Sequence, residues 1–535
     1  MKRKTKQIIK SLILTIIISL ILFYFYLPAI NITNPGFWFF LFLIIGIYMG
    51  IRVILILDWK TGKVYHNEIP RSFNYILTTM VIAIGIIIVI NLILSPVFQS
   101  KSYAKRIEIQ ENGNFKDDVN EVDFEKIPLL DKASTQKLGD RVMGEMTDLV
   151  SQFYVSDLYT QINYNNEIIR VTPLEYSGII KYFTNKKEGI KGYITVNSNT
   201  GESNLVRLEK GMKYMPSSLF NENLYRKLRF TYPTLNFGTE SFELDNEGNP
   251  YWVVPYISYA GIGIKQEISG IILLDPITGD TKKYNSDEIP TWIDHVYNAN
   301  LILEQVNDWG QYKKGYLNSI FGQKNVVATT DGYNYLVMDD DVYLYTGITS
   351  VVQDESNLGF ILCNMRTKET TYYSVPGAEE YSAMESAKGQ IQQMNYTPTF
   401  PLLINLKGNP TYLISLKDNA GLVKMYAFVD VVDYQKVAVT ESSKGIEKAA
   451  QNYLENVKYE LDDEKLVQKE IQIKSIKTAS IDGNTYYYIV DKEDKKYKVS
   501  IKIEENILPF LKEKDKLTIG YEKEEEVIEI IKIGK

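Results

Sequence analysis

Few residues in this chain are of the types that carry nucleophilic catalysis. The sequence has one cysteine, Cys363, and two histidines, His66 and His295. A Cys–His nucleophile would therefore have to pair Cys363 with His295, since the thiol needs a base within hydrogen-bond reach. Cys363, however, falls in the middle of a strand-like run, which favours a small apolar side chain in the core. His295, next to Asp294, is expected on a helix that links two parts of the chain.

Acidic side chains could support two other kinds of chemistry. Paired carboxylates among Asp275, Asp280 and Asp294 would suit a hydrolase, in which one group acts as the acid and another as the base. Calcium could use the acidic runs at 245–250 and 339–341, but neither has the length or the terminal Glu of an EF-hand loop. We interpret both runs as solvated turns, and we predict no metal and no cofactor.

The densest aromatic run falls in one predicted strand pair and contains Tyr251, Trp252, Tyr256 and Tyr259. Tyrosine and tryptophan combine a large apolar area with a polar tip, so such a run can line a groove that binds a peptide or a glycan. In the alternative interpretation the same side chains face the sheet core or cover an exposed sheet face. The sequence leaves both interpretations open.

Three apolar segments place these residues relative to a membrane. They cover about residues 12–28, 36–57 and 75–97, and each is close to the ~20 residues that a helix needs to cross a bilayer. A basic start precedes the first segment, as in a signal peptide, but bulky side chains stand where a cleavage site needs small ones. We therefore predict three retained spans within a transmembrane region, residues 1–98.

The placement of lysine and arginine predicts the orientation. The N-terminal segment is basic, and the loop after the second span carries Lys60, Lys63 and Arg71, whereas the link between the first two spans is uncharged. Basic loops are retained in the cytoplasm. We therefore predict a multi-pass protein of the cell membrane with a cytoplasmic N-terminus and with residues 99–535 outside.

The charge differs between these two parts. Residues 1–98 hold nine Lys or Arg and two Asp or Glu, a net +7, whereas residues 99–535 hold 50 and 64, a net −14. An acidic exterior argues against nucleic acid or anionic lipid as the partner. Residues 99–130 are polar and acidic, and they are predicted to form a tether between the membrane and the globular part.

One strand-and-turn pattern recurs along the exterior. The stretch "GIILLDPITGD" (270–280) aligns without a gap with "GYITVNSNTGE" (192–202) and "GFILCNMRTKE" (359–369), and residues 425–435 are a degenerate fourth version. A helix-like segment and an alternating strand pair precede each copy. We therefore predict four tandem modules, each a helix followed by an antiparallel sheet. A unit this small cannot bury its sheet face alone, so neighbouring copies should cover one another.

The final strand and turn of this pattern resemble the PepSY domain, whose hallmark is an Asp-x-x-Thr-Gly-acid turn. Two turns carry the motif: Asp275, Thr278, Gly279 and Asp280 match it, and Asn197, Thr200, Gly201 and Glu202 nearly do. In the third and fourth copies Lys368 and Tyr434 replace the glycine, so those turns must differ or carry strain. The resemblance implies a small α+β domain of envelope and secreted proteins, associated with binding or restraining peptidases, with no catalytic residues.

The C-terminal residues 454–535 contain five strand-like segments, with a short helical stretch between the third and the fourth. This order resembles a small OB-like β-barrel. Oligonucleotide binding would be the functional interpretation of such a barrel. The external location and the acidic balance favour an envelope β domain instead.

Together these features predict an α+β protein with three N-terminal transmembrane helices, a pair of modules in 131–290, a second pair in 291–445 and the C-terminal barrel. The predicted function is non-enzymatic: the repeated modules bind an unknown protein or peptide in the envelope, in a regulatory or scaffold role. One alternative is a structural subunit of a larger membrane machine, for which Gly46 and Gly50 would give the second span a helix-packing face. The other is an envelope hydrolase that uses the paired carboxylates.

Overall fold

The computed structural model describes residues 2–56, 72–338, 340–351, 353–457, 466–481, 484–521 and 526–534. The predictions that rest on Lys60, Lys63, His66, Arg71 and Asp339 concern residues outside these ranges. The chain divides into two compact units, Met1–Glu379 and Glu380–Lys535, and each is described by itself.

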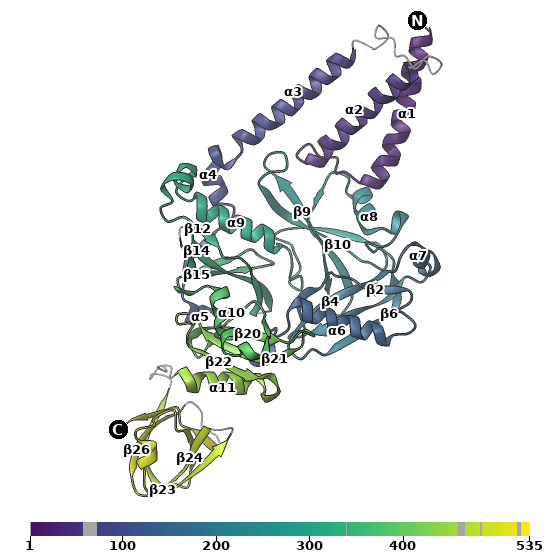
Figure 1. Ribbon diagram of the computed structural model, residues 1–535. Helices are drawn as coiled ribbons and strands as arrows, with labels where there is room; N and C mark the ends of the chain where they lie inside the picture. The colour runs from purple at the N-terminus through teal and green to yellow at the C-terminus, as the bar shows by residue number, and fades with distance from the viewer. Residues whose placement is uncertain are drawn as a thin grey trace. The chain divides into compact units, whose positions relative to one another are not determined.

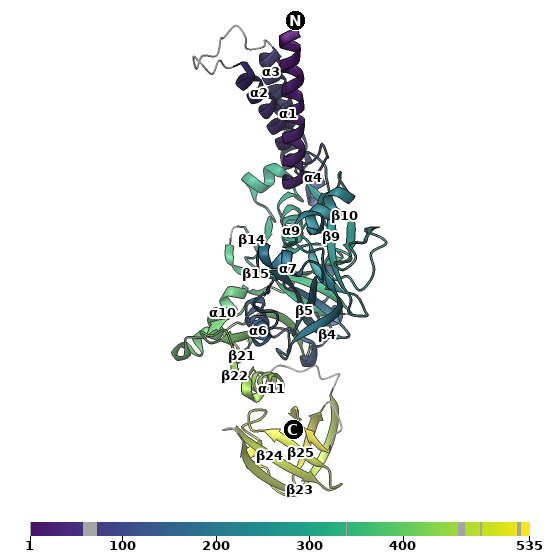
Figure 2. The same ribbon diagram turned by 90° about the vertical axis from the view of Figure 1, so that its right-hand side faces the viewer.

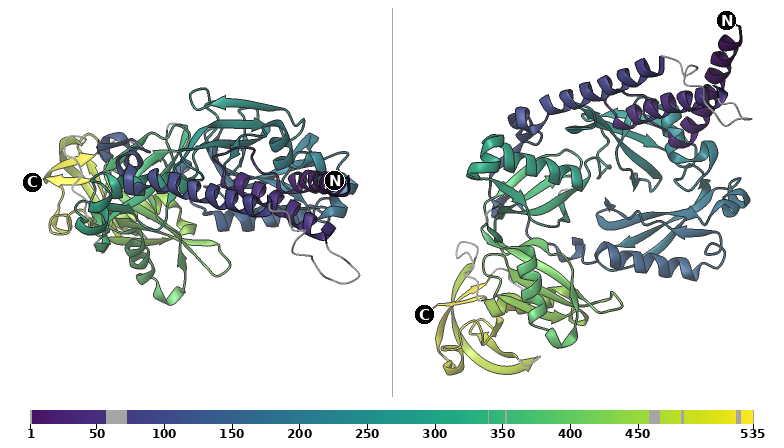
Figure 3. Two further views of the ribbon diagram at one scale, coloured as in Figure 1. Left: turned by 90° about the horizontal axis from the view of Figure 1, so that it is seen from above. Right: turned by 45° about the horizontal axis from the view of Figure 1, so that its top comes forward.

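Three helices at the start of the first unit are long and apolar enough to cross a membrane: α1 (Lys2–Tyr26), α2 (Pro35–Ile56) and α3 (Ser72–Ile93). This confirms the predicted transmembrane helices by length and composition. Helix α1 ends before Leu27, which has a φ of 52°, because the following Pro28 disfavours the helical conformation at the residue before it. Helix α3 diverges from α1 and α2 toward its C-terminal end, where α4 (Pro96–Ala104) follows (Figures 1 and 3).

Three antiparallel sheets make up most of the rest of the first unit, and they share one strand order. In each sheet the first two strands in the chain are short, and both pair with the third strand, which is long. The third strand also pairs with the fourth, and the fourth pairs with the fifth. The first sheet consists of β2 (Phe153–Val155), β3 (Thr160–Tyr164), β4 (Glu167–Tyr176), β5 (Ile190–Asn197) and β6 (Ser203–Met212). The second consists of β7 (Asn236–Phe237), β8 (Ser241–Leu244), β9 (Pro250–Tyr259), β10 (Gln266–Leu274) and β11 (Thr281–Asn285).

The third sheet has the same order and two additional strands. Its five common strands are β12 (Val327–Thr329), β13 (Asn334–Met338), β14 (Asp341–Ser350), β15 (Gln353–Asn364) and β16 (Thr370–Tyr373). Strand β17 (Gly377–Ala378) pairs with β15, and β1 (Ile109–Gly113) pairs in parallel with β16. A helix precedes each sheet in the chain: α6 (Lys132–Glu145), α8 (Leu224–Thr231) and α9 (Ala299–Tyr312). The remaining short helices are α5 (Phe115–Asp118), η2 (Phe124–Lys126), α7 (Ile179–Asn185), η3 (Phe220–Glu222) and η4 (Asn318–Gly322).

The second sheet is covered on both faces. Trp252 and Leu274 lie in a core that is shared with Val171 and Val196 of the first sheet. On the opposite face Val253, Ile271 and Leu273 pack in a second core with Leu301 and Ile302 of α9 and with Leu344 and Ile361 of the third sheet. Helix α9 lies between the second and third sheets (Figures 1 and 2). Strands β9 and β10 are therefore nearly continuously apolar, because both of their faces are buried.

Residues 99–130, which were expected to be a tether, contain ordered elements that pack on the first unit. Strand β1 extends the third sheet, and the ring of Phe115 lies edge-on to those of Phe360 and Tyr373, with centroids 5.2 and 6.0 Å away. Ile107, Phe115 and Val119 are buried despite the acidic composition of the segment. A few apolar residues at the right register are enough to anchor a polar segment to a sheet edge.

The second unit begins with α10 (Glu380–Gly389) and a sheet with the strand order of the other three. Its strands are β18 (Thr397–Pro398), β19 (Leu402–Leu406), β20 (Asn409–Lys417), β21 (Val423–Asp430) and β22 (Val437–Glu441). The short helices η5 (Gln392–Met394) and η6 (Ser442–Lys444) flank this sheet, and α11 (Ile446–Val457) follows it.

A curled, six-stranded sheet ends the second unit. Its strands are β23 (Val467–Ile481), β24 (Asn484–Asp491), β25 (Lys496–Ser500), β26 (Lys516–Tyr521), β27 (Val527–Glu529) and β28 (Lys532–Gly534), and η8 (Leu508–Phe510) connects β25 to β26. The strand count differs from the predicted five because the last apolar run is divided. Strand β27 pairs with β25 and β28 pairs with β26, at opposite edges of the sheet.

Candidate functional site

The residues of the two Thr-Gly turns form hydrogen bonds within their own turns. In the first sheet the amide of Gly201 donates to the carbonyl of Asn197 (2.9 Å), and in the second that of Gly279 donates to Asp275 (2.9 Å). The side chain of Asp275 accepts from the amides of Ile277 and Thr278, as that of Asn197 does from Asn199 and Thr200. Both glycines have a φ near +77°, 76° and 78° respectively, which suits glycine.

The third and fourth turns depart from glycine in different ways. The amide of Lys368 donates to Asn364 (2.9 Å) in the same arrangement, with a φ of 67°, so the third turn keeps its shape at the cost of backbone strain. In the fourth turn the amide of Asp430 donates to Lys436, six residues on rather than five, and Tyr434 lies in this longer loop. Where the glycine is missing, the third turn therefore carries strain and the fourth turn has a different shape, as the sequence predicted for such turns.

The carboxylates proposed for a hydrolase have different neighbours. Thr278 Oγ1 lies 2.9 Å from Oδ2 of Asp275 and 3.0 Å from Oδ2 of Asp280, so its one proton is shared between these two carboxylates within their own exposed turn. Asp294 is buried and accepts from the amide of Asn163 (2.8 Å), and its own amide donates to Glu243 (2.8 Å). Burial, reinforced by the charge of Glu243, raises the pKa of Asp294 well above its usual range. The sequence missed this buried pair because Glu243 and Asp294 are 51 residues apart.

Cys363 and His295 lie in environments that restrict their chemistry. Cys363 is fully buried in β15, and burial raises the pKa of its thiol to about 12, so the thiol stays protonated at neutral pH. His295 lies before α9 rather than on a helix, and its Nε2 is 2.6 Å from the carbonyl oxygen of Gln161.

The four aromatic residues do not share one exposed face. Trp252 is fully buried, its Nε1 donates to the carbonyl of Tyr214 (3.0 Å), and Tyr256 is buried in the same core. Tyr251 points to the opposite face, where its ring lies 5.5 Å from that of Trp292, and Tyr259 is half-buried. Alternation along a strand that is covered on both faces explains this division. Trp252 and Tyr256 thus lie in one core, and Tyr251 packs against the other.

A different group of interacting polar side chains lies where the three long apolar helices meet the second sheet. The β9–β10 loop lies between the N-terminal end of α2 and the C-terminal end of α3 (Figure 1). The side chain of Asn91 on α3 donates to the carbonyl of Ile262 and accepts from its amide, both at 2.9 Å. The amide of Gly263 donates to the carbonyl of Thr33, just before α2 (2.9 Å). We call this region, with α4, α8 and residues 27–35, the membrane junction.

Helix α8 joins the C-terminal end of α1 through two arginines. Arg229 Nε donates to the carbonyl of Leu27 (3.0 Å), and its Nη1 donates to that of Leu235 (2.7 Å). Arg226 Nε donates to the carbonyl of Tyr24 (3.1 Å), and its guanidinium lies 4.1 Å from the centre of that ring. Carbonyl oxygens at the end of a helix have no partner within it, and a guanidinium can satisfy several of them at once.

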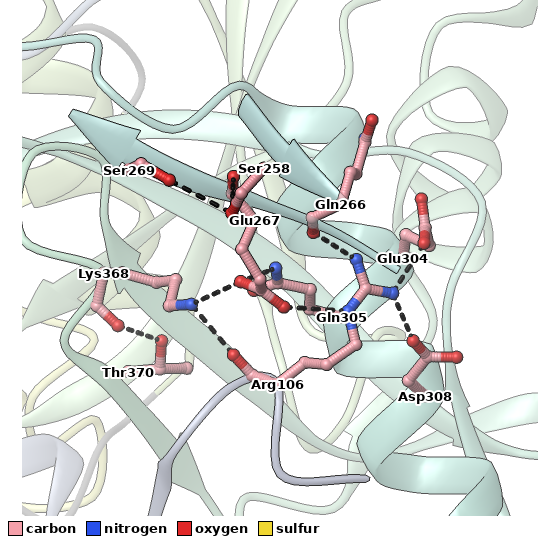
Figure 4. Close-up of polar contacts among 10 residues, drawn as sticks. All are labelled: Arg106, Ser258, Gln266, Glu267, Ser269, Glu304, Gln305, Asp308, Lys368 and Thr370. Carbon is pink, nitrogen blue, oxygen red and sulfur yellow. Dashed lines mark hydrogen bonds and ion pairs between the residues drawn. The ribbon is translucent and has the colours of Figure 1, made fainter. Parts of the chain in front are cut away.

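Arg106, just after α4, is the polar centre of the junction (Figure 4). Its side chain is fully buried, with Nε 3.1 Å from Glu267 and Nη1 2.6 Å from Glu304 and 2.5 Å from Asp308. Its Nη2 donates to the carbonyl of Gln266 (2.7 Å). The guanidinium thus joins the end of the membrane region to β10 and to α9.

Lys368 connects the third sheet to the same cluster. Its Nζ donates to the carbonyl of Arg106 (2.8 Å) and lies 3.4 Å from Glu267. Burial raises the pKa of Asp308 to about 6, although Arg106 opposes this shift. Among the described residues, no group of three or more His, Cys, Asp or Glu side chains is arranged to hold a metal ion. The arrangement is suited to holding α4, the second sheet and the third sheet in one geometry.

No family model matches the chain, and no curated protein sequence matches it.

Proposed function

We propose that this protein is a non-enzymatic, membrane-anchored protein of the cell envelope whose repeated PepSY-like modules lie outside the membrane and bind a protein partner. The common strand order of the four sheets and the matching turns at Gly201, Gly279 and Lys368 support descent from one module. The placement of lysine and arginine around the spans supports an exterior beginning at residue 99. In this proposal the C-terminal curled sheet is an OB-like envelope domain.

The observation that carries partner binding is a short helix whose apolar side chains point outward. Ile179, Ile180 and Phe183 of α7 are 64, 76 and 49% exposed, whereas Tyr182 of the same helix is buried. The ring of Phe183 lies 6.1 Å from that of Phe220, which is 53% exposed. We call Ile179, Ile180, Phe183 and Phe220 the α7 patch. Contiguous exposed apolar side chains of this kind mark interaction sites.

The position of the α7 patch favours a partner held at the same membrane surface. The carbonyl of Phe220 accepts from Arg226 Nη1 (2.5 Å), and the same guanidinium contacts Tyr24 at the outer end of α1. The patch is therefore continuous with the membrane junction. A membrane protein or a membrane-bound peptide could reach both regions together.

A second candidate is a structural subunit of a larger membrane machine. An apolar hollow of about 630 Å³ separates α3 from α1 and α2, and Ile16, Phe42 and Met80 contribute to its walls. A single apolar helix from another membrane subunit would fill such a gap by side-chain packing.

Photo-crosslinking in living cells tests the first proposal. A photoreactive residue at Ile180 or Phe183 should capture one protein, whereas the same residue at Phe321, which is 82% exposed on η4, should not. Ile180→Glu should then abolish co-purification of that protein, because a charge would have to be desolvated in the contact. Equal protein capture from Ile180, Phe183 and Phe321 would contradict partner binding. Crosslinks to lipid but to no protein from Ile180 and Phe183 would contradict it as well. Stoichiometric membrane partners that survive Ile180→Glu would favour the second candidate.

A further inference from the structure

A basic hollow lies beside α4 at the membrane junction. Its volume is about 590 Å³, and its walls include Lys101, Ser102 and Lys105 with Lys265 and Glu267 from the β9–β10 region. Lys101 and Lys105 are exposed, and Lys265 is half-buried. Three ammonium groups from two segments distant in sequence thus border one hollow.

The carboxylate in this hollow is already engaged. Glu267 contacts Arg106 and Lys368, and its Oε2 also accepts from Gln305 Nε2 (2.9 Å). Lys265 Nζ donates to Ser102 Oγ and lies 5.7 Å from the centre of the Tyr103 ring. Within the described part of the chain, none of Lys101, Lys105 and Lys265 forms an ion pair with a carboxylate. The hollow therefore has positive charge available for an anion.

The hydrogen bonds of the membrane junction hold this hollow next to the ends of the apolar helices. Helix α4 begins at Pro96, three residues after α3 ends at Ile93. Lys265 follows the loop whose Ile262 bonds to Asn91 of α3 and whose Gly263 bonds to Thr33. The lysines therefore lie where the apolar helices end, which is the level of the lipid headgroups.

We propose that this hollow binds the phosphate of an anionic lipid headgroup in the leaflet next to residues 99–379. Lysine ammonium groups bind phosphate as compact point charges with three donors each. The hydroxyl of Ser102 adds a further polar contact at the same wall. The net −14 of the exterior does not oppose this binding, because screening confines the interaction to charges within about 10 Å. This site is independent of the partner proposed for the α7 patch.

The test is lipid retention by the full chain in nanodiscs that contain phosphatidylglycerol and phosphatidylcholine. Native mass spectrometry should show retained phosphatidylglycerol on the wild type. The triple variant Lys101→Gln, Lys105→Gln, Lys265→Gln should lose this lipid by about fivefold for each lysine removed. The control variant Lys126→Gln, Lys132→Gln, Lys210→Gln removes three exposed lysines of η2, α6 and β6 and should retain it.

The outcomes separate lipid from other sources of phosphate. Retention that survives millimolar inorganic phosphate supports a headgroup site. Displacement of the lipid by inorganic phosphate at that concentration would overturn it in favour of a soluble anion. Equal retention by the two triple variants, or equal retention of phosphatidylcholine, would also overturn the proposal. The variants should have the same unfolding midpoint as the wild type, because the three lysines are not part of a core.

Discussion

At the scale of single residues, the most consequential side chains are buried ionisable groups that tie segments together. Arg106 contacts three carboxylates and a backbone carbonyl from two elements, and its side chain is fully buried. Glu175 is buried with Ser217, whose amide donates to it (3.0 Å) and whose hydroxyl also donates to it. The charge of Arg106 depends on its partners, since an unpaired buried charge is costly.

Replacing Arg106 should destabilise the first unit far more than replacing an exposed arginine. Arg106→Met leaves Glu267, Glu304 and Asp308 without their shared cation, and we expect a loss of about 3–5 kcal/mol in the free energy of unfolding. Arg141→Met is the matched control, because Arg141 is 71% exposed and lies 3.9 Å from Glu145, so its loss should be within about 0.5 kcal/mol. Denaturant unfolding in detergent measures both. Similar losses for the two variants would contradict the role assigned to Arg106.

Glu175 should make stability depend on pH. Burial raises its pKa to about 7 in the folded protein, although the hydrogen bonds from Ser217 oppose the shift. The folded state then holds a proton that the unfolded state has lost, so stability falls as the pH rises from about 4.5 to 7. Glu175→Gln should remove this dependence and should stabilise the protein above pH 7 by up to about 3 kcal/mol. Unfolding midpoints at pH 5 and pH 8 provide the measurement, and an unchanged difference between them would refute the assignment.

At the scale of elements, the turn between the last two strands of each common sheet shows how one backbone shape tolerates different residues. In the first three sheets this turn joins β5 to β6, β10 to β11 and β15 to β16. Gly201, Gly279 and Lys368 all have a positive φ and the same backbone hydrogen bond. Lysine is disfavoured there by about 1 kcal/mol. The contacts of Lys368 Nζ with Arg106 and Glu267 offset this cost. Lys368, the strained residue, is thus also the residue that connects the third sheet to the membrane junction.

The two glycine turns should respond differently to a methyl group. At Gly201 an added Cβ would lie 3.3 Å from Leu130 Cδ1, whereas at Gly279 it would lie 2.3 Å from the ring of Tyr214. Gly201→Ala should cost about 1 kcal/mol from the positive φ alone. Gly279→Ala should cost about 2–3 kcal/mol, because Tyr214 must also move. Thermal unfolding of the two variants tests the difference, and equal shifts would mean that the contact with Tyr214 relaxes freely.

At the scale of the whole molecule, the first unit unites the membrane helices with three sheets, and the junction connects them. The backbone of the β9–β10 loop bonds to Thr33 through Gly263 and to the side chain of Asn91 on α3 through Ile262, whereas α4 contacts Lys265 through the side chain of Ser102. Movement of the second sheet should therefore be transmitted to α2 and α3.

Cysteine labelling in intact cells tests the proposed orientation. The native Cys363 is fully buried and should contribute little background. An impermeant maleimide should label Asn204→Cys, at an exposed position on β6, without permeabilisation. Lys63→Cys, in the loop after the second span, should be labelled only after permeabilisation. Labelling of Lys63→Cys but not of Asn204→Cys in intact cells would reverse the topology.

Features that depend on a local pattern of residues could be predicted from the sequence. Uninterrupted apolar runs of about 20 residues specify membrane helices whatever the rest of the chain does. The Asn-x-x-Thr-Gly and Asp-x-x-Thr-Gly stretches specify turns through side-chain bonds to amides two and three residues on. The alternation before them indicated strands, although it could not show that the second sheet is covered on both faces.

Contacts between residues distant in sequence came from the way the chain folds back on itself. Trp252 and Tyr251 are neighbours in sequence, but they belong to different cores because separate parts of the chain cover the two faces of β9. Arg106 meets Glu267 and Asp308 across 161 and 202 residues, and no local pattern marks such a contact. The total charge of residues 99–535 likewise gave no sign of the basic hollow at α4, because an average over 437 residues says little about charges that act within a few ångströms.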